Sequence, residues 1–217
     1  MDGSGDILGR SGRKPKGEGY LRRAEILKVA QQIFVLEGYE RSTIRKIAEQ
    51  VGVSTTTLYM HFPDKDAIML EISRDGLREL ENIHDDFARR IADPVERLRL
   101  MMVAYVEFGR KNANLYELLF CLSDRTLGAE TQRAAAEMGE GCFNRFTDTV
   151  SEIAEQGRLR SDDVAANLQA IWTSCHGLTH MLNNNPNFPW APQDELIHLL
   201  ANALVAGLTI PATTPRA

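Results

Sequence analysis

The chain has 217 residues, 43% of them hydrophobic and 25% charged. This composition is typical of a folded globular protein and excludes an intrinsically disordered one. No apolar run reaches the roughly 18 residues that a membrane-spanning helix requires, and the polar, Gly-rich residues 1–13 lack the apolar segment of a secretory signal. Cys121, Cys142 and Cys175 are odd in number and lack metal-ligand spacing. We therefore expect a cytoplasmic protein without a disulfide framework, metal or cofactor.

The net charge of −5 is unevenly distributed along the chain. Residues 1–62 contain ten Lys or Arg and seven Asp or Glu, a balance of +3, whereas the remainder contains fifteen basic and twenty-three acidic residues, a balance of −8. A polyanion would therefore be attracted to the N-terminal part and repelled by the rest. On charge alone, a solvated tail remains the better interpretation of the basic run from Arg10 to Arg23.

Apolar residues recur at helical spacing along nearly the whole chain, and alternating, strand-like runs are nearly absent. The pattern predicts an all-α fold of nine helices, over residues 21–37, 43–50, 55–59, 65–90, 94–111, 115–122, 129–156, 162–182 and 193–208. No internal repeat interrupts this series. The N-terminal helices are short and the later ones long, which indicates a small N-terminal module on a larger helical domain.

The second and third predicted helices are joined by a tight turn at Gly52, and Ser54 can cap the third. Two short helices joined in this way after a longer one form a helix-turn-helix, in which the second short helix enters the major groove of DNA. A capped helical hairpin in an ordinary α-protein has the same spacing. Spacing alone therefore favours the DNA-binding interpretation only slightly.

The outward side of the third predicted helix carries Thr55, Thr56 and Met60, whose hydroxyl and methyl groups can contact base edges. Side chains that flank it can donate hydrogen bonds to phosphate oxygens. The candidate DNA-binding residues are Thr43, Arg45, Ser54, Thr55, Thr56, Thr57, Tyr59, Met60, His61 and Lys65.

Residues 24–70 resemble the N-terminal domain of the tetracycline-repressor (TetR) family, most clearly in the runs 43–48 (TIRKIA), 51–54 (VGVS) and 57–65 (TLYMHFPDK). The resemblance implies a nine-helix subunit, a homodimer and, usually, repression that a small ligand relieves. It assigns phosphate contacts to Thr43, Tyr59, His61 and Lys65. Thr56 departs from the family pattern, which often has Gly or Ala there.

Trp172, His176 and Gly177, together with the run 114–120 (NLYELLF), resemble the Trp-His-Gly class of TetR C-terminal domains. This resemblance suggests a fold and a mode of dimerisation, and it does not name a ligand.

We therefore expect a ligand-responsive DNA-binding regulator, most simply a repressor released from a palindromic operator by a small molecule. The expected parts are a basic flexible arm (1–19), a helix-turn-helix domain (20–66), a ligand-binding and dimerisation domain (67–210) and a C-terminal tail (211–217). No catalytic residue is predicted.

Aromatic and Met side chains are concentrated between the fifth and eighth predicted helices. Much of this set must be ordinary core, but a ligand-sensing helical domain also needs an apolar cavity with a few polar contacts. The candidate ligand-binding residues are Met101, Tyr105, Phe108, Tyr116, Phe120, Phe143, Trp172 and His176. They favour an apolar or aromatic-containing effector.

The last two predicted helices have wide apolar surfaces at the end of the chain, which a second copy could cover across a two-fold axis. The candidate dimer-interface residues are Leu168, Ile171, Cys175, Leu178, Met181, Leu200, Leu204 and Gly207. The alternative is that both helices pack entirely within one subunit.

The sequence also contains two Glu-x-x-His motifs, Glu81–His84 and Glu195–His198. Such a pair is typical of di-iron carboxylate bundles and offers a metalloenzyme as the alternative function. In the last predicted helix, however, Glu195 and His198 group with the polar side, whereas metal ligands must point inward. His176 and His180 lie one turn apart, but no acidic or Cys partner nearby in the sequence completes a metal site.

Overall fold

The computed structural model describes residues 19–113, 115–116 and 129–211. Its described residues form eight α-helices: α1 (Gly19–Glu37), α2 (Ile44–Val51), α3 (Thr55–Tyr59), α4 (Lys65–Arg90), α5 (Pro94–Lys111), α7 (Ala129–Glu155), α8 (Val164–Asn184) and α9 (Gln193–Leu208). The all-α prediction is confirmed over these residues, and eight of the nine expected helices are described. None of the described helices is both long enough and apolar enough to cross a membrane.

Several sequence-based expectations fall on residues outside the described ranges. They are Phe120, Cys121, most of the helix expected over 115–122, nearly all of the arm over 1–19 and nearly all of the tail over 211–217.

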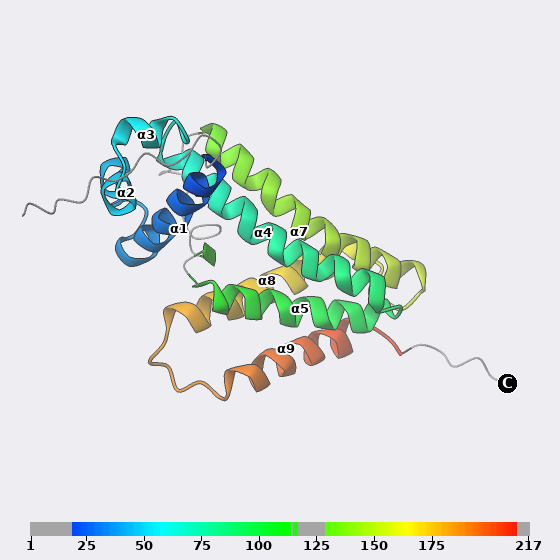
Figure 1. The fold of residues 1–217 in the computed structure, drawn as a ribbon. Helices are drawn as coiled ribbons and strands as arrows, with labels where there is room; N and C mark the ends of the chain where they lie inside the picture. The colour runs from blue at the N-terminus through cyan, green and yellow to red at the C-terminus, as the bar shows by residue number, and fades with distance from the viewer. Residues whose placement is uncertain (1–18, 114, 117–128, 212–217) are drawn as a thin grey trace, which may run out of the picture.

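The helices α1, α2 and α3 form a group at one end of the molecule (Figure 1), which we call the reader. Thr43 caps α2 by accepting a hydrogen bond from the Lys46 N–H at 3.2 Å, and Gly52 ends that helix with a left-handed φ of 74°. Ser54 caps α3 by accepting from the Thr57 N–H at 3.0 Å. Such caps satisfy N–H groups that would otherwise be unpaired, which stabilises helices of only eight and five residues. The buried core of the reader is made of Ile26, Ala30, Phe34, Ile47, Ala48, Leu58 and Phe62.

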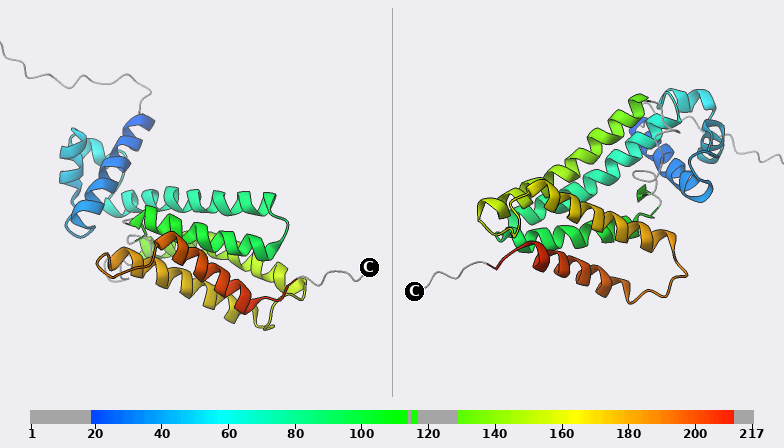
Figure 2. Two further views of the ribbon diagram at one scale, coloured as in Figure 1. Left: turned by 90° about the horizontal axis from the view of Figure 1, so that it is seen from below. Right: turned by 180° about the vertical axis from the view of Figure 1, so that it is seen from behind.

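The helix α4 leaves the reader and runs beside α7 along the larger C-terminal domain (Figure 1). The helix α5 is central, because it packs against α4, α7, α8 and α9. In Figures 1 and 2, α9 lies on the side of α5 opposite α4. A helix that is covered on most sides must be apolar on most sides, which accounts for the buried residues Leu98, Met101, Met102, Tyr105 and Val106 of α5.

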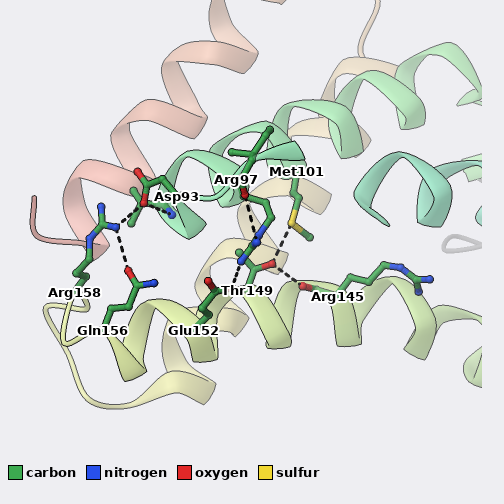
Figure 3. Close-up of polar contacts among 10 residues, drawn as sticks. Asp93, Arg97, Met101, Arg145, Thr149, Glu152, Gln156 and Arg158 are labelled. Carbon is green, nitrogen blue, oxygen red and sulfur yellow. Dashed lines mark hydrogen bonds and ion pairs between the residues drawn. The ribbon is translucent and has the colours of Figure 1, made fainter. Parts of the chain in front are cut away.

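Polar contacts fasten the end of the C-terminal domain that is remote from the reader (Figure 3). Arg158, which follows α7, pairs with Asp93, the cap of α5, while Arg97 of α5 pairs with Glu152 of α7. These two ion pairs tie the beginning of α5 to the end of α7.

The chain after α9 folds back onto the loop between α7 and α8. The Ile210 N–H donates to the Arg158 carbonyl at 2.9 Å, and the Arg160 N–H donates to the Leu208 carbonyl at 2.9 Å. These two bonds flank an isolated antiparallel bridge between Leu159 and Thr209. The end of α9 is therefore fixed to the loop after α7.

Candidate nucleic-acid interface and effector site

The base-reading candidates lie on the outer surface of α3. Thr55 and Thr56 are exposed, Met60 directly after the helix is 81% exposed, and the phosphate-contact candidate Tyr59 is 54% exposed. Leu58 is fully buried in the reader core. Because the apolar side of this short helix packs inward, the other side chains are presented to solvent in a fixed orientation. An exposed, oriented helix of this kind is what docking in a major groove requires.

The hydroxyl groups of Thr43 and Ser54 take part in capping. Thr57 is half-buried, and its hydroxyl lies 2.8 Å from that of Ser54. Thr43 is exposed, and a hydroxyl that accepts a hydrogen bond can still donate one to a phosphate oxygen. Arg45 is exposed on α2. The structure thus keeps Thr43 and Arg45 at the surface and ties Ser54 to Thr57.

Lys65 points into the reader. Its Nζ donates to the carbonyl oxygens of Tyr39 and Ser42 at 2.8 and 3.2 Å and lies 3.9 Å from the centre of the Tyr39 ring. An ammonium group has three N–H donors, so these two bonds leave one for a phosphate. The main structural role of Lys65 is therefore to join the start of α4 to the segment before α2.

Arg23 makes a second connection between the reader and α4, and sequence analysis grouped it only with the basic arm. Its guanidinium lies 4.0 Å from the centre of the Phe62 ring and donates to the His61 carbonyl. Arg23 Nε also donates to a carboxylate oxygen of Glu71 on α4 at 2.8 Å. His61 itself is half-buried beside this contact. The only signal in the sequence was a basic residue within α1, which does not identify its partner.

The predicted effector contacts meet around His176 of α8. Its Nε2 lies 2.8 Å from Tyr105 Oη, and its Nδ1 lies 2.6 Å from Tyr116 Oη. Burial lowers the pKa of His176 to about 4, so the imidazole is neutral at physiological pH. A neutral imidazole has one donor and one acceptor nitrogen, so one tyrosine donates to it and the other accepts from it.

Further aromatic rings pack on this group. The Trp172 ring lies 4.6 Å from His176, 5.4 Å from Tyr105 and 5.3 Å from Phe143, centre to centre. We call Tyr105, Tyr116, Phe143, Trp172 and His176 the aromatic cluster. Of the other candidates, Met101 and Phe108 are buried on α5. The sequence therefore identified residues that come together from α5, α7, α8 and residue 116.

His84 of α4 is a buried polar residue that sequence analysis placed only in a metal motif. It is 1% exposed, its ring nitrogens have no hydrogen-bond partner of good geometry among the described residues, and the ring packs edge-on against Phe146 at 5.2 Å. Burial, and then the nearby charge of Arg145, lowers its pKa to about 4. Its position one turn after the buried Leu80 and two turns after the buried Leu77 indicated in the sequence that it faces inward.

The two Glu-x-x-His motifs do not share a site. His84 is buried and Glu81 lies 3.5 Å from the Arg145 guanidinium, whereas Glu195 and His198 are exposed on α9. Within the described ranges, no group of three His, Cys, Asp or Glu side chains is arranged to hold a metal ion. The placement of the motifs therefore gives no support to the di-iron alternative.

Three residues expected at a dimer interface lie inside the subunit instead. Leu168, Ile171 and Cys175 are 5%, 1% and 1% exposed, on the helix that packs against α5 and α7. The apolar periodicity of α8 marks the side that faces its own subunit. Burial raises the pKa of the Cys175 thiol to about 12, which makes it an unreactive core residue.

The outer sides of α8 and α9 carry small residues and a few large apolar ones. Met181 is 43% exposed and Gly207 is exposed, while Leu178, Leu200 and Leu204 are half-buried. The predicted apolar surface of the last helix also included Leu199 and Ala203, which are exposed, whereas four exposed residues of α8 were not predicted to belong to the interface: Ala166, Ala170, Thr173 and Gly177. Leu199 is 65% exposed. Alanine and glycine give little apolar signal in a periodicity argument, although they permit close helix packing.

Comparisons with known proteins agree with this arrangement. Residues 26–72 match the family of bacterial regulatory proteins described as the tetR family, and residues 98–204 match the tetracyclin repressor-like C-terminal domain. The transcriptional activator FasR of Mycolicibacterium smegmatis is 27% identical over 179 residues, which cover 81% of this chain and 78% of FasR. The nucleoid occlusion factor SlmA of Vibrio cholerae is 34% identical over 147 residues, which cover 64% of this chain and 69% of SlmA.

The solved structure of FadR from Bacillus subtilis, in complex with stearoyl-CoA, has the same fold. It superposes with a TM-score of 0.72 at 22% identity and covers 85% of this chain and 98% of that one. The chain therefore belongs to the TetR family of DNA-binding, helix-turn-helix transcriptional regulators, and it is not an enzyme.

Proposed function

We propose that this regulator is a cytoplasmic repressor that binds a palindromic operator as a homodimer and releases it when a small molecule enters the C-terminal domain. One observation carries the proposal. The outer surface of α3 presents Thr55, Thr56 and Met60 to solvent, while Leu58 on its inner side is fully buried in the reader core.

The surface residues of the reader divide into two chemical roles. Thr55, Thr56 and Met60 contact bases, because hydroxyl groups pair with base edges and methyl groups pack on thymine methyls. Thr43, Arg45, Tyr59 and His61 position the reader through phosphate contacts, to which Lys65 adds its remaining donor. The basic arm over residues 1–19 contributes further phosphate or minor-groove contacts.

A second copy is needed because one reader offers few contacts, whereas two readers on a two-fold axis match a palindrome. We assign the interface to the outer sides of α8 and α9. Leu199 and Met181 are 65% and 43% exposed, and the exposed small residues Ala166, Ala170 and Gly177 of α8 allow helices to approach closely. A four-helix contact would cover these groups.

The effector site that we propose is the aromatic cluster. Its rings offer apolar surface, and its neutral imidazole with two phenol groups offers hydrogen bonds without a net charge. This chemistry suits an apolar chain or ring system with an uncharged hydrogen-bonding group. Because FadR of Bacillus subtilis was solved with stearoyl-CoA, acyl compounds are the first class to test. The effector must bind the DNA-free conformation more tightly, or it shifts nothing.

Selection of genomic fragments by the full-length protein tests the proposal. We expect recovery of a palindromic sequence, bound by one dimer, and loss of binding when acyl compounds or other apolar molecules are added. Since FasR is an activator, reporter transcription in the presence and absence of the protein separates repression from activation. Failure to enrich any sequence, with and without added ligands, would contradict operator binding.

A further inference from the structure

Leu115 and Tyr116 sit against two glycines that lie within helices. A β-carbon at Gly76 of α4 would come within 2.1 Å of Leu115 Cδ2. A β-carbon at Gly109 of α5 would lie 2.4 Å from Thr179 Cγ2 and 3.0 Å from Tyr116 Cδ2. Carbon atoms in contact are normally about 3.5–4.0 Å apart. The positions of Leu115 and Tyr116 therefore depend on the absence of a side chain at both glycines.

This pair of residues connects the aromatic cluster with α4. Tyr116 reaches His176 through its hydroxyl at 2.6 Å, and its N–H donates to the Asn112 carbonyl at 2.8 Å. Leu115 is the adjacent residue, is 4% exposed and touches the Gly76 backbone region. A displacement of Tyr116 that moves its backbone also moves the adjacent Leu115 relative to α4.

Gly76 lies in α4 between a part that is bonded to the reader and a part that is bonded to α7. Before it, Glu71 is bound by Arg23 of the reader. After it, Asp85 accepts two hydrogen bonds from Arg145 of α7, at 2.6 and 2.9 Å. A glycine weakens the interior of a helix, so the segment around Gly76 is where α4 bends at the lowest cost.

A pocket of about 330 Å³ adjoins the contact, between α1 and α4. Leu27 and Lys28 of α1 line one side of it, and Gly76 and Leu115 line another. Leu115 has room to turn into this pocket, and the turn would bring it against the reader. A displaced Leu115 either presses on α4 or turns toward α1. Both movements act on the reader.

We propose that Leu115 is a positioning residue for operator binding. Seated against Gly76, it sets the resting orientation of the reader, and an effector that draws Tyr116 away changes that orientation. The inference rests on the proposed function, which supplies the operator and the effector. Coupling between two sites requires one element whose position depends on both of them. The contact between Leu115 and Gly76 provides such an element between the effector site and the reader.

Three full-length variants test this role against a matched control. They are Gly76→Ala, Leu115→Ala and the double variant, and the control is Gly139→Ala, a helical glycine of α7 whose added β-carbon meets no atom of the described residues within 4 Å. Operator affinity is measured on the fragment recovered with the wild type. Spin-label distances between the exposed positions 50 and 155, introduced as Gln50→Cys and Glu155→Cys in a Cys121→Ser background, report the orientation of the reader without DNA. Labelled protein is mixed with an excess of unlabelled protein, so that the measured distances lie within one subunit.

We expect Gly76→Ala to lower operator affinity about tenfold and to shift the label distance, because its methyl group displaces Leu115. The double variant should restore operator affinity to within about twofold of the wild type and return the mean label distance to the wild-type value, because the clash is gone, while the distance distribution stays as broad as in Leu115→Ala. Identical results for Gly76→Ala and Gly139→Ala, or a double variant as impaired as Gly76→Ala, would overturn the proposal.

Leu115→Ala keeps the inference testable if Gly76→Ala does not fold. This variant adds no atoms, and removing the leucine should broaden the distance distribution. An unchanged distribution would overturn the proposal. The distance readout is independent of operator binding, so a failure of the proposed function shows separately, as a wild type that recovers no DNA.

Discussion

The reader and the C-terminal domain carry their functional side chains in different ways. In the reader, Thr55 and Thr56 stand on a five-residue helix closed by its own cap, Ser54. In the C-terminal domain, Tyr105 and His176 are 71 residues apart in sequence and meet only because α5 packs against α8. A change on the surface of the reader should therefore act on DNA recognition alone. A change in the aromatic cluster should disturb packing as well as ligand binding.

The largest expected effect comes from separating the two copies, because the reader depends on the C-terminal domain for its partner. Leu199→Glu places a charge on an α9 side chain that is 65% exposed in the subunit. We expect a folded monomer with operator affinity reduced at least about 100-fold, since linked binding of two readers is lost. Light scattering and operator titration measure both effects. Glu195→Gln, an exposed change one turn away, is the control, and a variant that stays dimeric would refute the assigned interface.

The next effect concerns the pH dependence of the core. Burial lowers the pKa of His84 from 6.5 to about 4, so between these values the unfolded chain holds a proton that the folded protein does not. The free energy of unfolding should therefore fall as the pH drops from 6.5 toward 4. These values correspond to about 2 kcal/mol lost between pH 8 and pH 5.

The variant His84→Leu removes this pH-dependent component, together with an imidazole that has no well-formed hydrogen bond to any described residue. We expect it to lose less stability than the wild type between pH 8 and pH 5 in urea unfolding. Taking the difference between the two proteins cancels the titration of the carboxyl groups that they share. Equal pH dependence would show that His84 is protonated or solvated in the folded state.

A smaller effect distinguishes Lys65 from Arg45, the two basic residues of the reader that were predicted to contact DNA. Lys65→Met removes two charge-assisted hydrogen bonds, to Tyr39 and Ser42, and should lower the free energy of unfolding by about 1.5 kcal/mol. The exposed Arg45, changed to Met, should instead reduce the slope of log K against log salt by about 0.9. If Lys65→Met reduced the slope and left stability unchanged, Lys65 would be a phosphate contact and not a structural one.

The smallest expected effect is an increase in the free energy of unfolding. Gly139 lies in the interior of α7, and a β-carbon there meets no atom of the described residues within 4 Å. Gly139→Ala should raise the free energy of unfolding by about 0.5–1 kcal/mol, because alanine loses less backbone entropy in a helix. Thermal unfolding of the two proteins measures it. A loss of stability would indicate that the outer side of α7 is covered in the assembled protein.

Helices whose ends are marked by a capping residue, a proline or a glycine could be predicted from the sequence. The helix α5 begins after the Asp93 cap with Pro94 in its first turn, as predicted. The reader was predicted for the same reason, since Gly52 and Ser54 set its boundaries locally. Such signals are local and survive any arrangement of the rest of the chain. The helix α9 has no side-chain cap, and its bounds were predicted from apolar periodicity and the preceding Pro-containing loop.

Features that depend on packing between distant segments could not be predicted in the same way. Apolar periodicity identified a buried side of α8 but not which partner buries it, so Leu168, Ile171 and Cys175 were assigned to the wrong contact. The direction of the Lys65 side chain depends on Tyr39, which is 26 residues away. That the His84 imidazole has no well-formed hydrogen bond to any described residue is visible only once α4 and α7 are together. Contacts between segments that are distant in the sequence leave no pattern within a single helix.

The most direct test of the central claim, that the exposed side of α3 reads bases, compares two reader variants on one set of DNA. Thr56→Ala and Tyr59→Phe are titrated with the selected operator and with operators changed at each base pair. We predict that Thr56→Ala loses about 1–3 kcal/mol of discrimination at one position in each half-site. Tyr59→Phe should weaken binding to every operator alike. A Thr56→Ala variant that discriminates all positions as well as the wild type would contradict the claim.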